Sequence, residues 1–153
     1  MPPGNGMPPA RRTPISAYLL DGRSRSNLRA MKMHLDRTGA AHRITGYGAG
    51  YVSVNDKPLT QSFIITPETL ITDWAPRCAT DLDEAAMEAI AHLSPGIVLL
   101  GTGQRQSFPP SSLLAPMLGR GVGVEVMTTA AACRTYNILI AEGRSVAAGL
   151  LVP

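Results

Sequence analysis

The sequence predicts a single-domain α/β fold of three layers, in which a mixed sheet carries helices on its faces. From Leu70 onward, strand-like and helix-like segments alternate, which is typical of crossover units in a largely parallel sheet. The apolar run Ile97–Leu100 stops at Gly101-Thr102-Gly103, as a strand buried on both faces would. A length of 153 residues, 44% hydrophobic and 16% charged, fits one globular domain.

The first segment, residues 1–30, is predicted to be a disordered arm preceding a domain over residues 31–153. It holds five prolines among Gly, Ser and Arg, and its only apolar cluster is Tyr18–Leu20. Five arginines against Asp21 give it a net charge of +4, which leaves −1 for the remainder of a chain of net charge +3. We interpret the arm as a solvated tail, a start placed too early, a targeting presequence or an anion-binding tail.

A β-hairpin is predicted next. After an extended lead-in over Lys32–Arg43, Ile44–Val54 forms one strand and Leu59–Thr66 the other, joined by a turn at Asn55–Pro58. Gly46, Gly48 and Gly50 resemble a phosphate loop, but their alternate spacing in a strand favours a bulge or a close backbone crossing.

A short strand, Leu70–Trp74, and a first helix follow the hairpin. Asp81 is the predicted N-cap, because Glu84 three residues later completes a capping-box spacing. The apolar stripe from Leu82 to Leu93 predicts about three helical turns before Ser94-Pro95-Gly96 ends the helix.

Two further helices are predicted after the strand Ile97–Leu100. Ser112 is the predicted cap of the first, which Pro116 keeps short or bent. A second buried strand, Val122–Met127, leads to Thr128 or Thr129 as the cap of a helix that Gly143 closes. A last strand over Ser145–Val152 completes the sheet.

Any binding site of such a fold is expected where the carboxyl ends of its strands meet. Arg105, beside Gln104, is suited to a carboxylate or a phosphate. The predicted groove for a ligand or partner comprises the residues that follow three of the strands: Asp73, Trp74, Gly101, Thr102, Gly103, Gln104, Arg105, Thr128 and Thr129.

Several classes of activity lack their sequence signals. Gln106 stands where a dinucleotide fold needs its third glycine, and no P-loop motif is present. The three histidines have no nucleophile-elbow context, and Cys78 and Cys133 are predicted to be two small buried thiols. We therefore assign no catalytic residue, metal ligand or cofactor and lean against an enzyme. The near-neutral body and the lack of an 18-residue apolar run argue against nucleic acid and an integral membrane segment.

Three stretches carry a resemblance to a known family: Tyr51–Phe63, Leu99–Gly103, and Val124–Leu139 with Glu142-Gly143-Arg144. Over about Met33–Val152 the chain resembles the small α/β family of unknown function that includes the Mth-domain proteins and a mitochondrial complex I assembly factor. The resemblance implies a compact mixed-sheet fold, no established catalytic activity and an assembly or interaction role. The family's motif positions here are Gly101, Thr102, Gly103, Thr128, Ala132, Thr135, Asn137, Glu142 and Arg144.

Two functions remain open on the sequence. The first is a non-enzymatic interaction or assembly module that binds a protein partner near the Gly-Thr-Gly turn. The alternative is a domain, enzymatic or not, for a small molecule or an anionic cofactor at Gly101–Arg105 and Thr128. We expect a bacterial cytoplasmic protein, or a mitochondrial one if the arm is a presequence.

Overall fold

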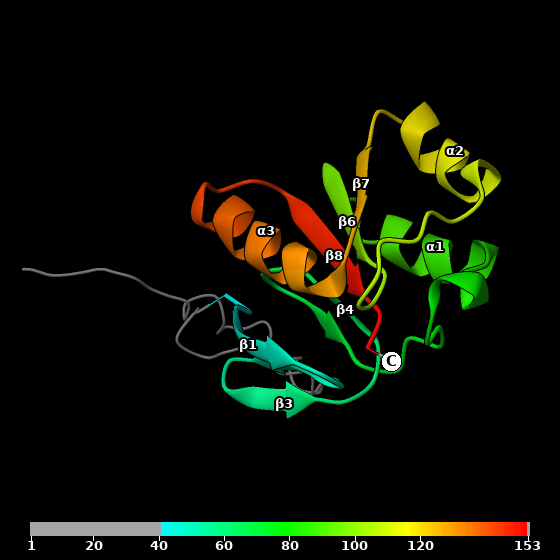
Figure 1. Ribbon diagram of the computed structural model, residues 1–153. Helices are drawn as coiled ribbons and strands as arrows, with labels where there is room; N and C mark the ends of the chain where they lie inside the picture. The colour runs from blue at the N-terminus through cyan, green and yellow to red at the C-terminus, as the bar shows by residue number, and fades with distance from the viewer. Residues whose placement is uncertain (1–40, 153) are drawn as a thin grey trace, which may run out of the picture. The chain divides into compact units, whose positions relative to one another are not determined.

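A computed structural model describes residues 41–152, which fold as a compact unit from His42 onward (Figure 1). The predicted arm over residues 1–30 and the extended lead-in up to residue 40 lie outside the described residues. The fold is a mixed α/β single domain with two sheets and three helices, which confirms the predicted fold class.

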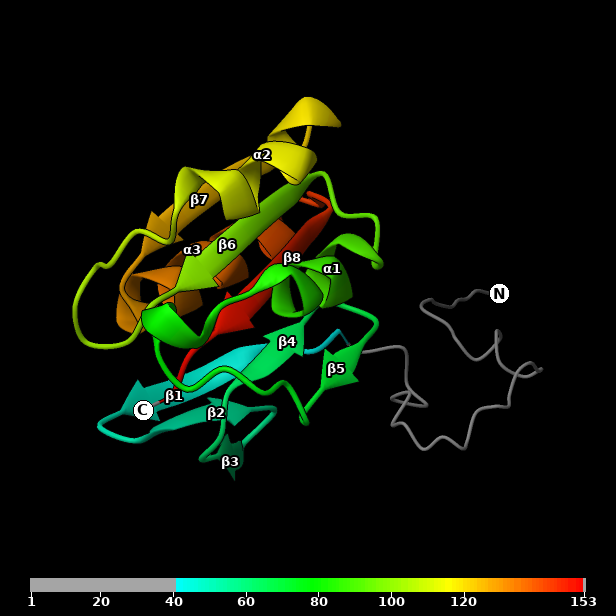
Figure 2. The same ribbon diagram turned by 90° about the vertical axis from the view of Figure 1, so that its right-hand side faces the viewer.

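The larger sheet has five strands in the order β5-β4-β8-β6-β7. Its centre is parallel, because β6 pairs in parallel with both β7 and β8, whereas β4 pairs antiparallel with β8 and β5. The predicted mixed sheet is therefore confirmed (Figure 2). The strands are β4 (Phe63–Ile65), β5 (Leu70–Ile71), β6 (Ile97–Gly101), β7 (Gly123–Met127) and β8 (Val146–Leu150).

The smaller sheet is an antiparallel meander of β1 (Ile44–Gly48), β2 (Tyr51–Val54) and β3 (Lys57–Leu59). The predicted single hairpin is thus wrong in two places. The stretch Ile44–Val54 turns back at Ala49-Gly50, where Gly50 has φ +80°. The stretch Leu59–Thr66 is divided between the two sheets, because β4 belongs to the larger one. The expected bulge is present, since the register shifts between Ile44 and Gly46.

The three helices are α1 (Glu84–Ala91), α2 (Ser111–Gly119) and α3 (Thr129–Ala141). Helices α1 and α2 lie on one face of the larger sheet, and α3 lies on the other face with the smaller sheet (Figures 1 and 2). Alternate residues of the buried strands supply the two cores: Leu99 faces α3, while Val98 and Leu100 face α1 and α2.

Two predicted helix starts differ from the structure. Asp83, not Asp81, is the N-cap of α1, because its carboxylate accepts the backbone N–H of Ala86 at 2.8 Å. Asp81 instead ends a short 3₁₀ helix and accepts the N–H of Arg77 at 3.1 Å, so that α1 is eight residues long. Helix α2 begins at Ser111 with Pro110 in the N-cap position, two residues before the predicted cap Ser112, and no side chain caps it.

The predicted buried strand Val122–Met127 is also corrected. It forms β7, the edge of the larger sheet, and Gly123 and Glu125 are exposed. One side of this strand pairs with β6 and the other side has no strand beside it in the described part of the chain. Its valines contact the core on one face only. The apolar pattern therefore predicted a strand correctly but did not show whether that strand lies at the centre or at the edge of the sheet.

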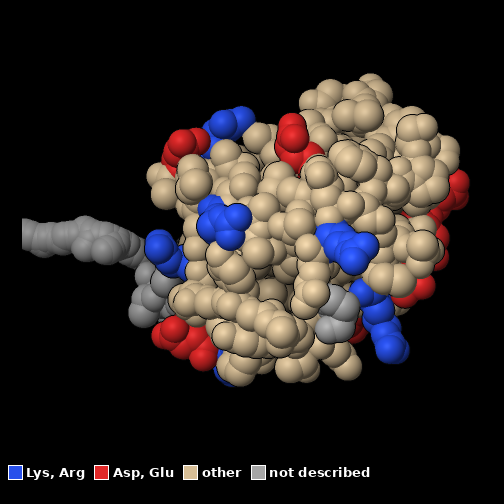
Figure 3. Space-filling model, in the orientation of Figure 1, with Lys and Arg blue, Asp and Glu red and all other residues tan. Residues whose placement is uncertain are grey.

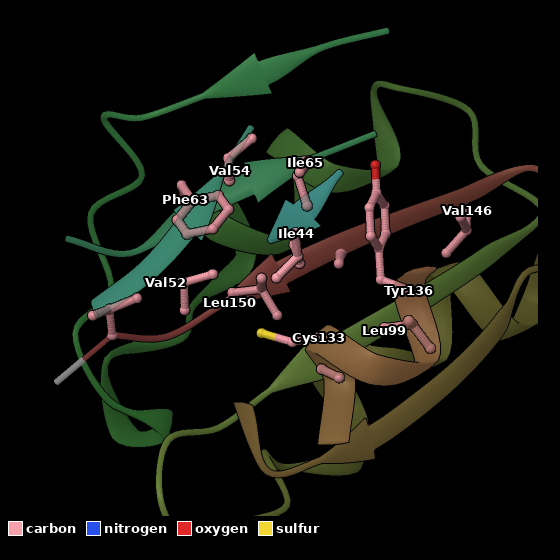
Figure 4. Packing of buried hydrophobic residues seen from close by; sticks show 13 residues of the cluster. Ile44, Val52, Val54, Phe63, Ile65, Leu99, Cys133, Tyr136, Val146 and Leu150 are labelled. Atoms are coloured by element: carbon pink, nitrogen blue, oxygen red, sulfur yellow. The ribbon is translucent and has the colours of Figure 1, made fainter. Parts of the chain in front are cut away.

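Helix α3 holds β1 in place through two side chains. Asn137 accepts the backbone N–H of Ile44 at 3.1 Å and donates to its carbonyl oxygen at 2.7 Å. Tyr136, which is 0% exposed, donates its hydroxyl to the carbonyl oxygen of His42 at 2.8 Å. Figure 4 shows Tyr136 among the side chains packed between α3 and the strands. The smaller sheet is therefore fixed to α3 by side chain to backbone hydrogen bonds.

The two cysteines have different environments. Cys133 is buried on α3, and burial raises its pKa from 9.0 to about 12 although Arg134 opposes the shift. Cys78 is exposed, so the expectation of two buried thiols is wrong for it. The pair Glu142 and Arg144 lies at the end of α3 with 3.9 Å between Oε1 and Nη1, and both side chains are largely exposed. Such a pair contributes about 0–1 kcal/mol.

The buried thiol predicts a loss of stability at high pH. Between pH 9.0 and about 12 the unfolded chain releases the Cys133 proton while the folded chain keeps it. The free energy of unfolding should therefore fall as pH rises through this range, by about 1.4 kcal/mol per pH unit. Urea denaturation at several pH values measures the slope. Cys133→Ala should reduce this slope between pH 9 and 10. At higher pH the buried Tyr136, whose pKa is also raised by burial, causes a further loss of stability of its own. An unchanged slope in Cys133→Ala would contradict the attribution of this pH dependence to the buried thiol.

Candidate functional site

A groove of about 900 Å³ opens where three segments of the chain meet. One wall is the Thr102–Arg105 loop after β6 together with the first turn of α3, and the other is the hairpin of β1 and β2. Thr128 forms the N-cap of α3, as predicted, because its hydroxyl accepts the N–H of Ala131 at 3.2 Å. The groove therefore lies at the carboxyl end of the central parallel strand, on the face that carries α3.

The end of β6 is a glycine because α3 approaches it closely. A Cβ on Gly101 would lie 2.9 Å from the Cα of Thr129 and 3.1 Å from the Cβ of Ala132. Gly103 has φ +96°, a conformation that side chains disfavour. These two glycines bring the backbone of the loop against the start of α3, and so set the shape of the groove wall.

The threonine hydroxyls of this wall are engaged in holding it together. Thr129 accepts the N–H of Gly103 at 2.8 Å and donates to the carbonyl oxygen of Leu151 at 2.7 Å. Thr102 donates to the carbonyl oxygen of Arg105 at 2.8 Å and accepts the N–H of Ser107 at 3.0 Å. The hydroxyls of Thr102 and Thr129 therefore already have partners. Thr102 closes the loop after β6, and Thr129 joins this loop to the start of α3 and to the segment after β8.

Removing the Thr129 hydroxyl should destabilise the contact between the loop after β6, the start of α3 and the segment after β8. Thr129→Val keeps the size of the side chain but leaves the N–H of Gly103 and the carbonyl of Leu151 without their partner, a loss of about 1–3 kcal/mol. Urea denaturation measures the free energy of unfolding. Thr129→Ser keeps the hydroxyl and should retain most of the stability, and Thr135→Val makes the same change farther along α3. Equal losses for the two valine variants would contradict the role of Thr129.

The structure brings together most, but not all, of the residues predicted for the site. The groove is lined by Thr102, Gly103, Gln104, Arg105, Thr128 and Thr129, and Gly101 is buried behind them. Asp73 and Trp74 line a separate pocket beside α1. Trp74 is 7% exposed and donates its Nε1–H to the carbonyl oxygen of Ala86 at 3.1 Å. The chain after β5 thus turns toward the α1 face, away from the groove.

The other wall of the groove was not anticipated from the sequence. It includes Tyr47 and Tyr51, each 38% exposed, and the segment with Arg77 and Cys78 adds to the rim. Arg134 of α3 donates from Nη1 to the hydroxyl of Tyr47 at 2.8 Å. The only signal for this wall was the pair of tyrosines four residues apart in the predicted strand, and ordinary surface strands carry the same pattern.

Arginines are the charged side chains that line the groove. Among residues 41–152, no His, Asp or Glu lines it, and the sulfur of Cys78 lies 3.1 Å from the hydroxyl of Thr80. Within residues 41–152, no group of His, Cys, Asp and Glu side chains is arranged to hold a metal ion. No helix among these residues has the length and apolar character to cross a bilayer. Figure 3 shows separated basic side chains on the face that carries α3, with acidic ones at the upper and lower edges of that face as well as toward α1.

Comparison with known proteins identifies relatives of this chain. A family model described as "Protein of unknown function (DUF498/DUF598)" matches residues 44–151. A protein from Bordetella parapertussis with a known crystal structure is 39% identical, with a TM-score of 0.71 over 74% of this chain and 98% of that one. A Mth938-like domain from Bordetella pertussis is 34% identical, with a TM-score of 0.67 over 80% and 92% of the two chains.

The name of a human relative describes its function. NADH dehydrogenase (ubiquinone) 1 alpha subcomplex assembly factor 3 of Homo sapiens is 31% identical over 112 residues, which is 72% of this chain and 60% of that protein. The chain spans between half and two thirds of the length of the first curated relatives that it matches. The family model, over residues 44–151, covers the two sheets, the three helices and every lining residue of the groove except Val152.

Proposed function

This chain belongs to the DUF498/DUF598 family, and on that premise we propose that it is a non-enzymatic module of the assembly type, which binds a protein partner in the groove beside the Gly-Thr-Gly turn. The relationship to complex I assembly factor 3 supports the assembly role. The proposal places the partner between the hairpin of β1 and β2 and the Thr102–Arg105 loop.

One observation carries this proposal. The hydroxyls of Thr102, Thr128 and Thr129 are engaged in hydrogen bonds that build the wall. The exposed side chains of the groove include two tyrosines and two arginines, beside Gln104 and Cys78. Tyrosine and arginine are the residues that most often dominate the energy of protein interfaces. The groove thus offers contact area and hydrogen-bond donors on a rigid frame, without a general base beside a nucleophile.

Site-specific crosslinking in the native host tests the proposal. Tyr51 is replaced by a photoreactive phenylalanine analogue, and the same analogue at Leu118, an exposed residue of α2 outside the groove, serves as the control. We expect one discrete polypeptide to be crosslinked from position 51 and not from position 118. The same polypeptide should be lost when Arg105→Ala is added. Crosslinking that is equal at both positions, or that ignores Arg105, would refute the proposal.

An anionic small molecule is the second candidate function. The groove volume falls in the range of small-molecule sites, and Arg77 and Arg105 line it beside the N-terminal turn of α3. Native mass spectrometry of protein purified from its own host separates the two candidates. A retained small ligand that is lost on Arg105→Ala would favour this second function, and a co-purifying protein without a ligand would favour the first.

A further inference from the structure

The charges in the groove are all of one sign. Arg77 and Arg105 line it, and Arg134 stands beside it, bonded to the hydroxyl of Tyr47. Acidic residues outnumber basic ones between His42 and Val152, yet none of them lines the groove. Three aspartates line the separate pocket beside α1 instead. This separation of charge gives the groove a positive potential that favours an anionic occupant.

The wall on the hairpin side is an open strand edge. Within residues 41–152, strand β1 is the outer strand of the smaller sheet, and only β2 pairs with it. The side chain of Asn137 takes up the N–H and the carbonyl of Ile44, at the start of the strand. The opposite end of β1, with Tyr47 and Gly48, lines the groove. An open edge of this kind can receive an extended chain through backbone hydrogen bonds.

An aromatic ring is fixed at the same end of the hairpin. A Cβ on Gly48 would lie 2.6 Å from Cε1 of Tyr51, so the glycine is what allows the tyrosine ring to lie against the backbone of β1. The residues pair across the two strands, which places them on the same face of the sheet. A ring held this way presents contact area without losing much side-chain entropy on binding.

These observations rest on the proposed function and go further, because they describe its partner. We infer that the groove receives an extended acidic segment of another polypeptide, which runs along the free edge of β1 and places its carboxylates on Arg77 and Arg105. The chain's own first 40 residues carry mostly basic charges, the same sign as the groove, and are therefore unsuited to occupy it.

Fluorescence anisotropy with two labelled peptides tests this inference on the full chain. In one peptide threonine alternates with glutamate, and in the other it alternates with lysine. The glutamate peptide should bind at least about tenfold more tightly than the lysine peptide, and its affinity should fall as salt is added. The double variant Arg77→Glu and Arg105→Glu should lose at least about tenfold of that affinity. The double variant Arg120→Glu and Arg144→Glu, an equal charge change outside the groove, should not.

The outcomes separate this inference from the proposed function. Binding of the glutamate peptide that survives in the double variant would place it on the basic N-terminal residues and overturn the inference. Equal affinity for the two peptides would overturn it as well, and so would weak binding of both. In each of these cases, a polypeptide crosslinked from position 51 alone would leave the proposed function standing. A small ligand retained in the groove without any crosslinked polypeptide would refute both.

Discussion

Tyr136→Ala is expected to lower the free energy of unfolding by about 3–5 kcal/mol, because it empties the site of the largest fully buried side chain among the described residues. The ring lies between α3 and the strands, with Ile44, Ile65 and Val146 in the same cluster (Figure 4). Proteins of this size are stable by about 5–15 kcal/mol, so the change removes a large share of the total. Urea denaturation followed by circular dichroism measures it.

Tyr136→Phe is the matched control, because it keeps the ring and removes only the hydroxyl. That hydroxyl donates to the carbonyl oxygen of His42, so the loss should be about 1–3 kcal/mol. Equal losses for the two variants would show that the hydrogen bond matters and the packing does not, contrary to our account. A loss below about 1 kcal/mol for the alanine variant would mean that the core collapses around the site.

Gly101→Val is expected to destabilise the fold by about 3 kcal/mol and to deform the groove. Even the first added carbon would lie 2.9 Å from the backbone of Thr129 and 2.9 Å from Cδ2 of Leu150. The start of α3 would have to move away from β6, which would break the hydrogen bonds between Thr129 and Gly103. Thermal and urea denaturation measure the loss of stability, and hydrogen exchange at the start of α3 measures the displacement.

Gly123→Ala is the control for Gly101, since it lies at the other end of the same pair of strands. Its nearest neighbour to an added Cβ is Cγ1 of Ile97 at 4.0 Å, so there is room for the methyl group. The alanine should change stability by no more than about 0.5 kcal/mol. If Gly101→Ala were as mild as Gly123→Ala, the close approach of α3 would not be the reason for the glycine.

The elements that could be predicted from the sequence are those whose signals are local. The uniformly apolar run of β6 can only be satisfied between two covered faces, and the structure buries it there. The threonine before the Ala-rich start of α3 supplies its N-cap, and Gly143, with φ +77°, follows its last turn. Asn137, one of the motif positions of the resemblance, pairs with the backbone of Ile44, a partner 93 residues away that no local pattern indicates.

The elements that were placed wrongly depend on longer-range information. Asp81 and Asp83 are both suitable caps, and the 3₁₀ turn that engages Asp81 has no clear local signal. An edge strand such as β7 contains the same valines as a central one, and only its neighbours decide how much of it is covered. The turn at Ala49-Gly50, unlike Asn55-Asp56, lacks a strong hairpin dipeptide.

Only one of the two walls of the groove was predicted from the sequence. The rule that sites lie at the carboxyl ends of parallel strands located the loop after β6 and the start of α3. It included Asp73 and Trp74 because β5 runs in the same direction as β6, but β5 is at the far edge of the sheet and its continuation packs on the α1 face. Tyr47 and Tyr51 belong to the smaller sheet, and no pattern within the hairpin indicates that this sheet packs beside the loop after β6.

The position of Trp74 has a practical consequence for optical experiments. It is the only tryptophan, and Gly149 leaves space for its indole, since a Cβ there would be 2.7 Å from Cη2. The ring is buried among α1 residues and does not line the groove. Its emission should therefore shift to longer wavelength when the chain unfolds and remain constant when the groove is filled. Intrinsic fluorescence thus reports denaturation separately from occupancy, without any label on the protein.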